Sequence, residues 1–503
     1  MDSLIGWVNL LVDTENCFLD INPPDTILSK EVESLTSQTF NDFNIDKPIS
    51  LIRSNLSIFH ENMHLLTDVV IKNNFPMIIL QFGDVLTECS SSENIETVNY
   101  FEFLGYKISK FDEMFSTHFA IGNGQNFNFE NSHYFLAKYF RIISKHRESY
   151  NEIQKIKDVE EKFQYLLDYE LSIILFYLGD IEEGYRNCDN VVFSKYAEQM
   201  LKNSSLVSQQ YYTSPLKVKQ RIENVFRLPG NLKPSSSSLL KNNNGYLLNL
   251  RAVNYSLNEN CKGSSFDKDG IIRTRNFLIQ LNNKLQLDYG SELIDESKFS
   301  YFGANVKGFE DLRLINDKYF LANSQELNKT NTPQIVLGEI KNNKIVKILS
   351  LSISDVLECE KNWLPFCVNN ELLIIYKSSP FQIYKFDFLE QSLSLFKKID
   401  HFENKSIDFR GSAPPIPYKD GFLFTVHQVA FTKSRIYYHR FVYLSSDFET
   451  MKYSKCFYFK KAGIEYNLSI CNSDTGLIIT HSENDNSSYI SIVDYKVVDE
   501  LFE

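Results

Sequence analysis

The hydrophobic and polar positions divide the chain into three zones, of which the first, residues 1–125, alternates short apolar runs with amphipathic segments. The apolar runs at 51–53 and 75–82 have the composition of buried strands. Between them, residues 60–73 carry apolar side chains at helical spacing. This strand–helix–strand order predicts a βαβ unit with a parallel sheet.

The second zone, residues 126–225, is predicted to be helical, because apolar side chains recur at helical spacing through segments such as 163–175. In the segment 169–187, Gly179 can end one helix and Asp180 can cap the next. The pair resembles a tetratricopeptide-type helical hairpin, and a generic hairpin of two helices fits the same residues.

The third zone, residues 226–503, changes to short apolar strands separated by turns. Pro229-Gly230, and then Pro234 with four serines after it, mark the boundary. Strands are expected at 246–255, 274–281, 320–323, 334–340, 372–376, 421–427, 436–444, 476–481 and 488–493. Turn residues precede an apolar strand at 243–245, 316–318, 369–371 and 419–421. Copies about 50 residues or more apart suit propeller blades, and this zone has room for five.

Composition narrows the classes of partner. The 503 residues are enough for two to four domains of about 100–200 residues each. A net charge of −12 argues against a general nucleic-acid binder, which needs a basic face. The 40 Phe and 28 Tyr fit strand-rich structure and would also serve sugar-stacking surfaces.

The cysteines and the apolar runs indicate the cellular compartment that the protein is expected to occupy. None of the eight cysteines has CxxC spacing, so a zinc or redox motif is not expected, and sparse cysteines in so long a chain favour a reduced, cytoplasmic protein. No run approaches the roughly 18 apolar residues of a membrane span.

Candidate chemistry centres on residues 308–315, where Glu310, Asp311 and Arg313 open an apolar strand. One carboxylate can pass a proton, and the arginine can hold it ionised or bind an anion. Other polar motifs recur at blade-like intervals, where inner strands of a propeller would point them at one central pocket. They are Arg251, Asn254 and Tyr255; Thr274 to Asn276; Lys361 to Trp363; Arg410 to Ser412; His427; Tyr438 to Arg440; and Glu465 with Tyr466.

Each motif also has a purely structural explanation. Glu310 to Arg313 could form a surface ion pair at a turn. A lone histidine such as His427 on an apolar strand is more often a satisfied core residue. Trp363 could be a core anchor, and the Arg410 motif a turn before a strand.

Taken in order, the motifs resemble the β-mannoside phosphorylase and β-mannosyltransferase group of five-bladed propellers, over residues 226–495. In that group a Gly-x-Glu-Asp-Pro-Arg motif supplies the single catalytic acid, and here Leu312 stands where proline is usual. Other matching features are Lys-Asn-Trp-x-Pro at 361–365, Arg-Gly-Ser-x-Pro at 410–414, Gly-Ile-Glu-Tyr at 463–466, and His481 to Asp485.

The resemblance implies inverting transfer of a mannose-like sugar, with Asp311 as the proton donor or acceptor and a phosphate as nucleophile or leaving group. No cofactor is implied; the co-substrate would be inorganic phosphate or a nucleotide sugar such as GDP-mannose. The cations would clamp phosphate, and Trp363 would stack on a sugar ring. The substrate- or phosphate-binding residues expected are Arg251, Asn254, Arg275, Asn276, Arg313, Lys361, Asn362, Trp363, Arg410, Ser412, His427, His439, Arg440 and Glu465.

The first zone also bears a resemblance. Segments 39–43, 49–59, 75–82, 104–107 and 119–121 look like the latter half of FkbM-type methyltransferases, without the acidic residues and glycine of that family's motif. We therefore expect residues 1–125 to form an α/β remnant without cofactor, or an unrelated α/β cap. The predicted protein is multidomain: this α/β part, a helical domain at 126–225 and a five-bladed β-propeller at 226–503.

Two rival functions stay open. The propeller could bind glycan or protein without catalysis, with the helical zone as a docking surface for a protein partner. Alternatively it could hydrolyse glycosides, which needs a second carboxylate to activate water; Glu326 and Glu465 are the candidates. Within the leading hypothesis, the appended helical and α/β zones favour a transferase over a phosphorylase.

Overall fold

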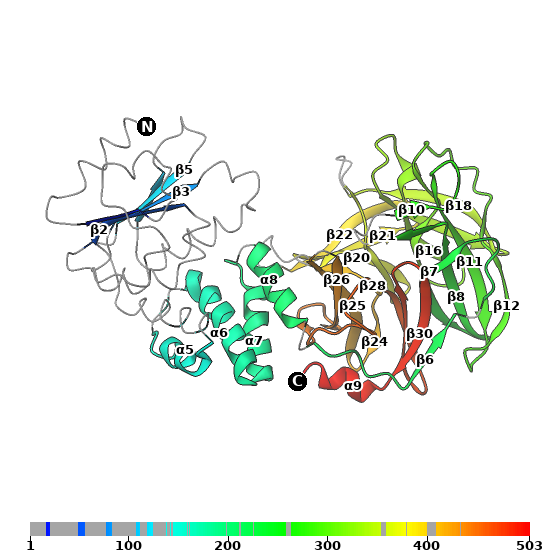
Figure 1. Ribbon diagram of the computed structural model, residues 1–503. Helices are drawn as coiled ribbons and strands as arrows, with labels where there is room; N and C mark the ends of the chain where they lie inside the picture. The colour runs from blue at the N-terminus through cyan, green and yellow to red at the C-terminus, as the bar shows by residue number, and fades with distance from the viewer. Residues whose placement is uncertain are drawn as a thin grey trace. The chain divides into compact units, whose positions relative to one another are not determined.

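The protein was described from a computed structural model, in which the chain divides into two compact units, Met1–Ser205 and Leu206–Glu503 (Figure 1). The structure describes the backbone of five strands before residue 124, residues 137 and 141, and residues 144–503 except 158, 160, 198, 211–212, 225, 258–262, 354–358, 379, 400–408 and 433.

The five early strands form a mixed sheet in the order β1-β2-β3-β5-β4. They are β1 (Cys17–Asp20), β2 (Ile49–Asn55), β3 (Met77–Phe82), β4 (Lys107–Lys110) and β5 (His118–Asn123). Strands β1, β2 and β3 pair in parallel, and β5 pairs antiparallel with β3 and β4. The predicted parallel strands are therefore confirmed, whereas the helix predicted at 60–73 lies outside the described residues. The likeness of this zone to FkbM-type methyltransferases stays a prediction.

The middle zone contains the predicted helical hairpin. The helices described there are α5 (His146–Ile153), α6 (Gln164–Leu178), α7 (Ile181–Phe193) and α8 (Gln199–Gln209), with a 3-10 turn, η5, at Glu161–Phe163. Gly179 ends α6 in the left-handed conformation at φ 85°, and the Asp180 side chain accepts a hydrogen bond from the Glu183 N–H at 3.3 Å. The turn chemistry read from the sequence is confirmed, and the tetratricopeptide likeness stays a prediction.

Strands of the second unit form, within the residues described, five sheets and one two-stranded ribbon. The first sheet contains β7 (Lys233–Asn242), β8 (Gly245–Val253), β11 (Ile272–Leu281), β12 (Leu287–Glu292) and β14 (Val306–Lys307). The second contains β13 (Ile294–Asp295), β15 (Glu310–Leu314), β16 (Tyr319–Ser324), β17 (Gln334–Lys341) and β18 (Lys344–Leu351), and a 3-10 turn, η6 (Gln325–Leu327), follows β16. The ribbon is β9 (Tyr255–Leu257) with β10 (Gly263–Ser265).

The remaining three sheets complete the unit. The third contains β19 (Leu364–Val368), β20 (Glu371–Ser378), β21 (Phe381–Asp387) and β22 (Ser392–Ile399). The fourth contains β23 (Arg410–Gly411), β24 (Ile416–Tyr418), β25 (Gly421–Phe431), β26 (Arg435–Ser445) and β27 (Met451–Tyr453). The fifth contains β28 (Glu465–Ser473), β29 (Gly476–Glu483), β30 (Ser487–Val493) and β6 (Gln220–Glu223). All the strands predicted in this zone are confirmed.

The five sheets follow one another in a ring, the arrangement of a five-bladed propeller. Apolar clusters join neighbours: Leu278 of the first sheet packs with Leu312 of the second, and Leu321 of the second with Ile374 of the third. Phe381 of the third sheet stacks on Phe424 of the fourth. Further clusters join the fourth sheet to the fifth and the fifth to the first, so the ring has no gap.

The ring is closed by β6, which pairs antiparallel with β30 from the end of the chain (Figure 1). This strand precedes residue 226, where the sequence pattern changes. The serines after Pro234, read from the sequence as a boundary, lie instead within β7, and Ser235 to Ser238 are all buried. A short helix, α9 (Tyr495–Glu500), follows β30 and packs on the fourth and fifth sheets through Val498.

The repeated turn signals link the first strand of a sheet to the second. Asn369 and Asn370 between β19 and β20, and Lys419 between β24 and β25, have positive φ, as does Gly245 at the start of β8. Asn and Gly tolerate this conformation, which explains why these residue types recur at such turns.

Candidate active site

Asp311 lies at a β-bulge near the start of β15. Glu310 is opposite Asn323 of β16 while Arg313 is opposite Leu321, so β15 carries one residue more than its partner. Asp311 has φ 51°, in the left-handed region that residues other than glycine seldom occupy. Such conformations cost on the order of 1–3 kcal/mol and cluster at functional sites.

Leu312, which stands where the resembling family has proline, fills the core beside this bulge. Its side chain is fully buried and packs in a cluster with Leu278, Phe309 and Phe320. The bulge therefore forms without the proline, with an apolar side chain anchoring its inner side.

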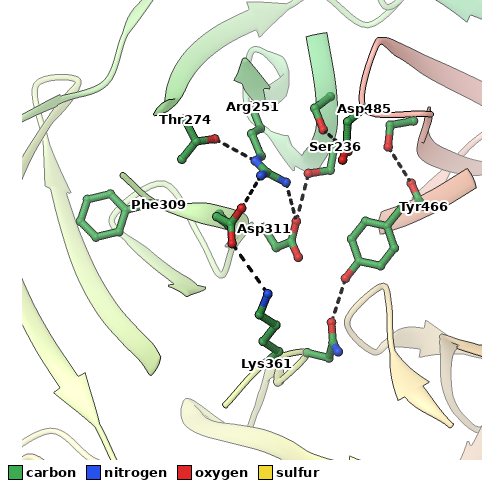
Figure 2. A network of polar contacts seen from close by, with 12 residues as sticks. Ser236, Arg251, Thr274, Phe309, Asp311, Lys361, Tyr466 and Asp485 are labelled. Atoms are coloured by element: carbon green, nitrogen blue, oxygen red, sulfur yellow. Dashed lines mark hydrogen bonds and ion pairs between the residues drawn. The ribbon is translucent and has the colours of Figure 1, made fainter. Parts of the chain in front are cut away.

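The Asp311 carboxylate is held by two donors from the first sheet. Arg251 Nη1 lies 3.4 Å from Asp311 Oδ1, and the Ser236 hydroxyl donates to the same oxygen at 3.2 Å (Figure 2). Arg251 also donates to Glu310 Oε1 at 2.5 Å and to the Thr274 hydroxyl at 2.8 Å. Burial acts to lower the pKa of Arg251, but Glu310, Tyr255, Asp311 and Asp485 outweigh it and raise that pKa.

Lys361, from the segment before the third sheet, brings a second cation to Glu310. Its Nζ lies 3.8 Å from Glu310 Oε2, whereas Arg251 binds the other oxygen, Oε1 (Figure 2). The Lys361 side chain is 38% exposed and that of Asp311 16%, whereas that of Arg251 is 7% exposed. Lys361 is therefore the most exposed of these four side chains, and both carboxylates, Glu310 at 13% and Asp311 at 16%, are partly exposed beside it.

Arg313 does not contact the Asp311 carboxylate, which differs from the expectation. It is buried, and it donates to the backbone oxygens of Asp311 at 3.1 Å and Ser412 at 3.0 Å, and to the Tyr466 hydroxyl at 2.9 Å. Tyr466 donates in turn to Asn362 Oδ1 at 3.1 Å. Arg313 thus joins the second sheet to the fourth and fifth, and Arg251 replaces it as the ionic partner of Asp311.

The fourth sheet contributes a buried dyad. Ser412 Oγ and His427 Nδ1 are 2.8 Å apart, and Arg410 lies opposite His427 in the pairing of β23 with β25. Burial lowers the pKa of His427 well below its ordinary value, and His439, Arg410 and Arg313 add to the effect. His427 is therefore a neutral imidazole near neutral pH.

Several predicted cations are engaged elsewhere. Arg275 pairs with Glu292 of β12, on the opposite face of the sheet from Arg251. Arg440 is buried and donates to the Ser454 backbone oxygen at 2.9 Å. His439 is fully buried, and burial lowers its pKa to about 4. The predicted cation cluster is therefore split, with Arg251 at both Glu310 and Asp311 and Lys361 at Glu310.

Three further residues predicted to bind substrate instead stabilise the protein structure. Asn276 donates to the Phe309 backbone oxygen at 2.9 Å, directly before Glu310. Asn254 bonds to Asp267 and to the Ile271 backbone and so holds the loop after β10. Trp363 is buried, with its indole N–H on Glu360 at 3.0 Å, and packs as a core residue instead of presenting a face to a sugar.

Glu326 and Glu465, the candidates for a second catalytic carboxylate, both hold backbone. Glu465 accepts the N–H groups of Phe459, Lys460 and Lys461. Glu326 accepts the N–H of Gly308 at 2.7 Å.

Sequence reasoning missed part of this network. Ser236 was hidden in the run taken for a boundary, and its neighbour Ser235 donates to Asp485 at 2.7 Å. Tyr255 donates to the other oxygen of Asp485 at 2.8 Å. The run of small polar residues between two turn signals was the available clue, because small side chains let inner strands approach one another closely.

Two glycines allow the backbones of neighbouring sheets to approach closely near the site. Gly308 has φ 91°, and a Cβ there would lie 2.2 Å from the Thr274 backbone oxygen. A Cβ on Gly411 would lie 2.3 Å from the Asn362 backbone oxygen. Glycine is therefore required where the second sheet meets the first and where the fourth meets the third.

No family model matches the chain, and no curated protein matches it. Solved structures do. A β-1,2-mannobiose phosphorylase from Listeria innocua is 14% identical with TM-score 0.36, over 58% of this chain and 97% of its own. A mannose phosphorylase from Leishmania mexicana in complex with phosphate ion is 9% identical with TM-score 0.37, over 59% and 94%. A glycosyl hydrolase from Bacteroides ovatus is 10% identical with TM-score 0.36, over 53% and 85%.

These neighbours include mannoside phosphorylases and glycoside hydrolases, but likeness at this level carries no argument about the function of this chain. Among the residues that the structure describes, no helix is long and apolar enough to cross a membrane. Within that same set, no group of three or more His, Cys, Asp or Glu side chains is placed to hold a metal ion.

Proposed function

We propose that the propeller catalyses inverting glycosyl transfer on mannose-like sugars, as a glycoside phosphorylase or a glycosyltransferase, with Asp311 as its catalytic carboxylate. The observation that carries the proposal is the placement of Asp311: a partly exposed carboxylate on a left-handed bulge, fixed by Arg251 and Ser236, with Lys361 near it. Strained backbone conformations cluster at active sites, and Asp is among the side chains that transfer protons there.

The chemistry needs one proton and one anion. In phosphorolysis, a phosphate oxygen bonds to the anomeric carbon from the face opposite the departing sugar oxygen, the glycosidic C–O bond breaks, and Asp311 gives its proton to that oxygen. Synthesis is the reverse, with Asp311 taking a proton from the acceptor hydroxyl. Because phosphate is already a nucleophile, no second carboxylate has to activate water.

The residues around the site support a mechanism in which Asp311 is the single catalytic carboxylate and phosphate is the nucleophile. Glu326 and Glu465 are occupied with backbone N–H groups, which disfavours hydrolysis through either of them. Lys361 would bind the phosphate, or the diphosphate of a nucleotide sugar such as GDP-mannose, since it is the more exposed of the two cations paired with Glu310.

The substitution Asp311→Asn tests the assignment, because it keeps the shape of the side chain and removes its proton chemistry. Turnover of mannose 1-phosphate with mannoside acceptors, or of GDP-mannose, should fall by about 100-fold or more. Phosphate release would mark a phosphorylase and GDP release a transferase. Asp317→Asn, at an exposed turn, is the matched control and should turn over normally.

Equal rates in the wild type and Asp311→Asn would remove Asp311 from the mechanism. Measurable glycan binding without turnover of either donor would instead favour the non-catalytic binding propeller.

A further inference from the structure

The Tyr466 hydroxyl occupies a position between three sheets. It accepts from Arg313 Nη2 at 2.9 Å and lies 3.1 Å from Asn362 Oδ1. A guanidinium can only donate, so the tyrosine oxygen accepts from Arg313 and its own proton goes to Asn362. Burial raises the pKa of Tyr466, with smaller effects from Arg313 and Asp311, so the hydroxyl keeps this proton across the physiological range.

Asn362 is the residue directly after Lys361, and its backbone is fixed from two sides. It has φ 65°, in the left-handed region, and its backbone oxygen lies against Gly411. Its side chain accepts the hydrogen bond from the Tyr466 hydroxyl. Figure 2 shows the Tyr466 ring turned toward the segment that holds Lys361. The conformation from which Lys361 extends is thus held by the fourth sheet, through Gly411, and by the fifth, through Tyr466.

At its other end, this series of hydrogen bonds reaches Asp311, the proposed catalytic acid. Arg313 donates to the Asp311 backbone oxygen at 3.1 Å with Nη1 while its Nη2 binds Tyr466. One buried guanidinium therefore ties the strained backbone of Asp311 to the segment of Lys361.

We infer that Tyr466 is a positioning residue that, through Asn362, sets where Lys361 stands relative to Glu310 and Asp311. It touches no substrate in this role. The inference rests on the proposed function in one respect: if Lys361 binds the anionic co-substrate, Tyr466 also sets the affinity for that anion.

The test uses the full-length chain with Tyr466→Phe, which removes the hydroxyl and keeps the ring against His427. The matched control is Tyr443→Phe, which removes a hydroxyl bonded to Asp420 at an exposed turn. The first measurement is the rate at which acetic anhydride modifies Lys361, followed by mass spectrometry of its peptide. Loosening of the Lys361–Glu310 pair should raise that rate by about threefold in Tyr466→Phe and leave it unchanged in the control.

The second measurement is the affinity for inorganic phosphate by calorimetry, together with kcat and KM for turnover. Tyr466→Phe should weaken phosphate binding by about fivefold or more and raise KM for phosphate more than it lowers kcat. In the double variant with Lys361→Ala, the loss should be no greater than with Lys361→Ala alone, because both changes act on one contact.

The outcomes separate the two claims. An unchanged modification rate at Lys361 overturns the role of Tyr466, whatever the turnover. A raised rate in a protein whose wild type neither binds phosphate nor turns over any donor supports the role of Tyr466 and refutes the proposed function. If Tyr466→Phe does not fold, Asn362→Gly tests the same link, since glycine keeps the left-handed backbone and deletes the acceptor.

Discussion

At the scale of single residues, the site depends on backbone conformations that cost free energy. Asp311 and Asn362 are both left-handed, and each lies beside a glycine contact between sheets. The cost is met by packing and hydrogen bonds around them, in particular the burial of Leu312 and the three bonds of Arg313.

Gly308→Ala tests this dependence. A Cβ at φ 91° and 2.2 Å from the Thr274 oxygen must displace backbone, so we expect the free energy of unfolding to fall by about 3 kcal/mol. Urea unfolding measures the change. Gly303→Ala is the control, because a Cβ there meets nothing within 4 Å, and it should alter stability by about 0.5 kcal/mol or less. Equal effects of the two changes would contradict the close contact.

The buried His439 should make the free energy of unfolding depend on pH. Its pKa falls from an ordinary 6.5 to about 4 on burial, so the unfolded chain binds a proton that the folded chain refuses. The stability is intact above pH 6.5 and is lost progressively as the pH falls from 6.5 to 4, by about 3 kcal/mol from this residue.

Urea unfolding at pH 7 and at pH 5 measures this loss. His439→Gln should flatten the dependence, because its side chain does not titrate. An identical slope in wild type and variant would show that other groups carry it, such as His427 and His481, whose pKa values burial also lowers.

The partner of Asp311 shows where residue-level prediction stops. The spacing favours Arg313, two positions along the strand, whereas the structure gives Arg251, from another sheet. The bulge turns the Asp311 side chain away from that of Arg313. Neither the bulge nor the close approach of two sheets can be predicted from the spacing of these residues in the sequence. The sequence indicated that Glu310, Asp311, Arg251 and Lys361 belong together, but not how they pair.

At the scale of elements, the sheets were predictable where side chains alternate or form apolar runs. Strands such as β25 and β29 are buried along almost their whole length, and their composition indicates as much. The inner strand β7 was not predictable in this way, because its serines are typical of turns and are tolerated here by hydrogen bonds to the fifth sheet, such as that of Ser237 with Ser488 of β30.

The closing strand β6 gives a prediction at this scale. Ile222 lies opposite Ile490 of β30, and Ile222→Pro removes its N–H from the ladder and fits the strand poorly. We expect the melting temperature to fall by about 5 °C or more, because the ring loses its closure. Lys217→Pro, in the irregular segment before β6, is the control and should melt close to the wild type; equal losses would show that β6 does not close the ring.

At the scale of the whole molecule, the proposed site is a product of ring formation. Ser236 and Arg251 come from the first sheet, Asp311 from the second, Lys361 from the segment before the third, and Tyr466 from the fifth. The fourth sheet enters through the Ser412 backbone. Because no single sheet holds a carboxylate with its donors and cation, the network exists once all the sheets are in place.

The pairing of β6 with β30 therefore has a consequence for synthesis on the ribosome. Among the strands of the ring, β6 emerges before all the others, and its partner β30 emerges after them. Until then β6 is an unpaired edge, and the last sheet lacks a strand. Folding must wait for a contact between β6 and β30, which makes it slow and exposes it to aggregation, so emergence of β30, and not emergence of Asp311, is the moment from which the site can form.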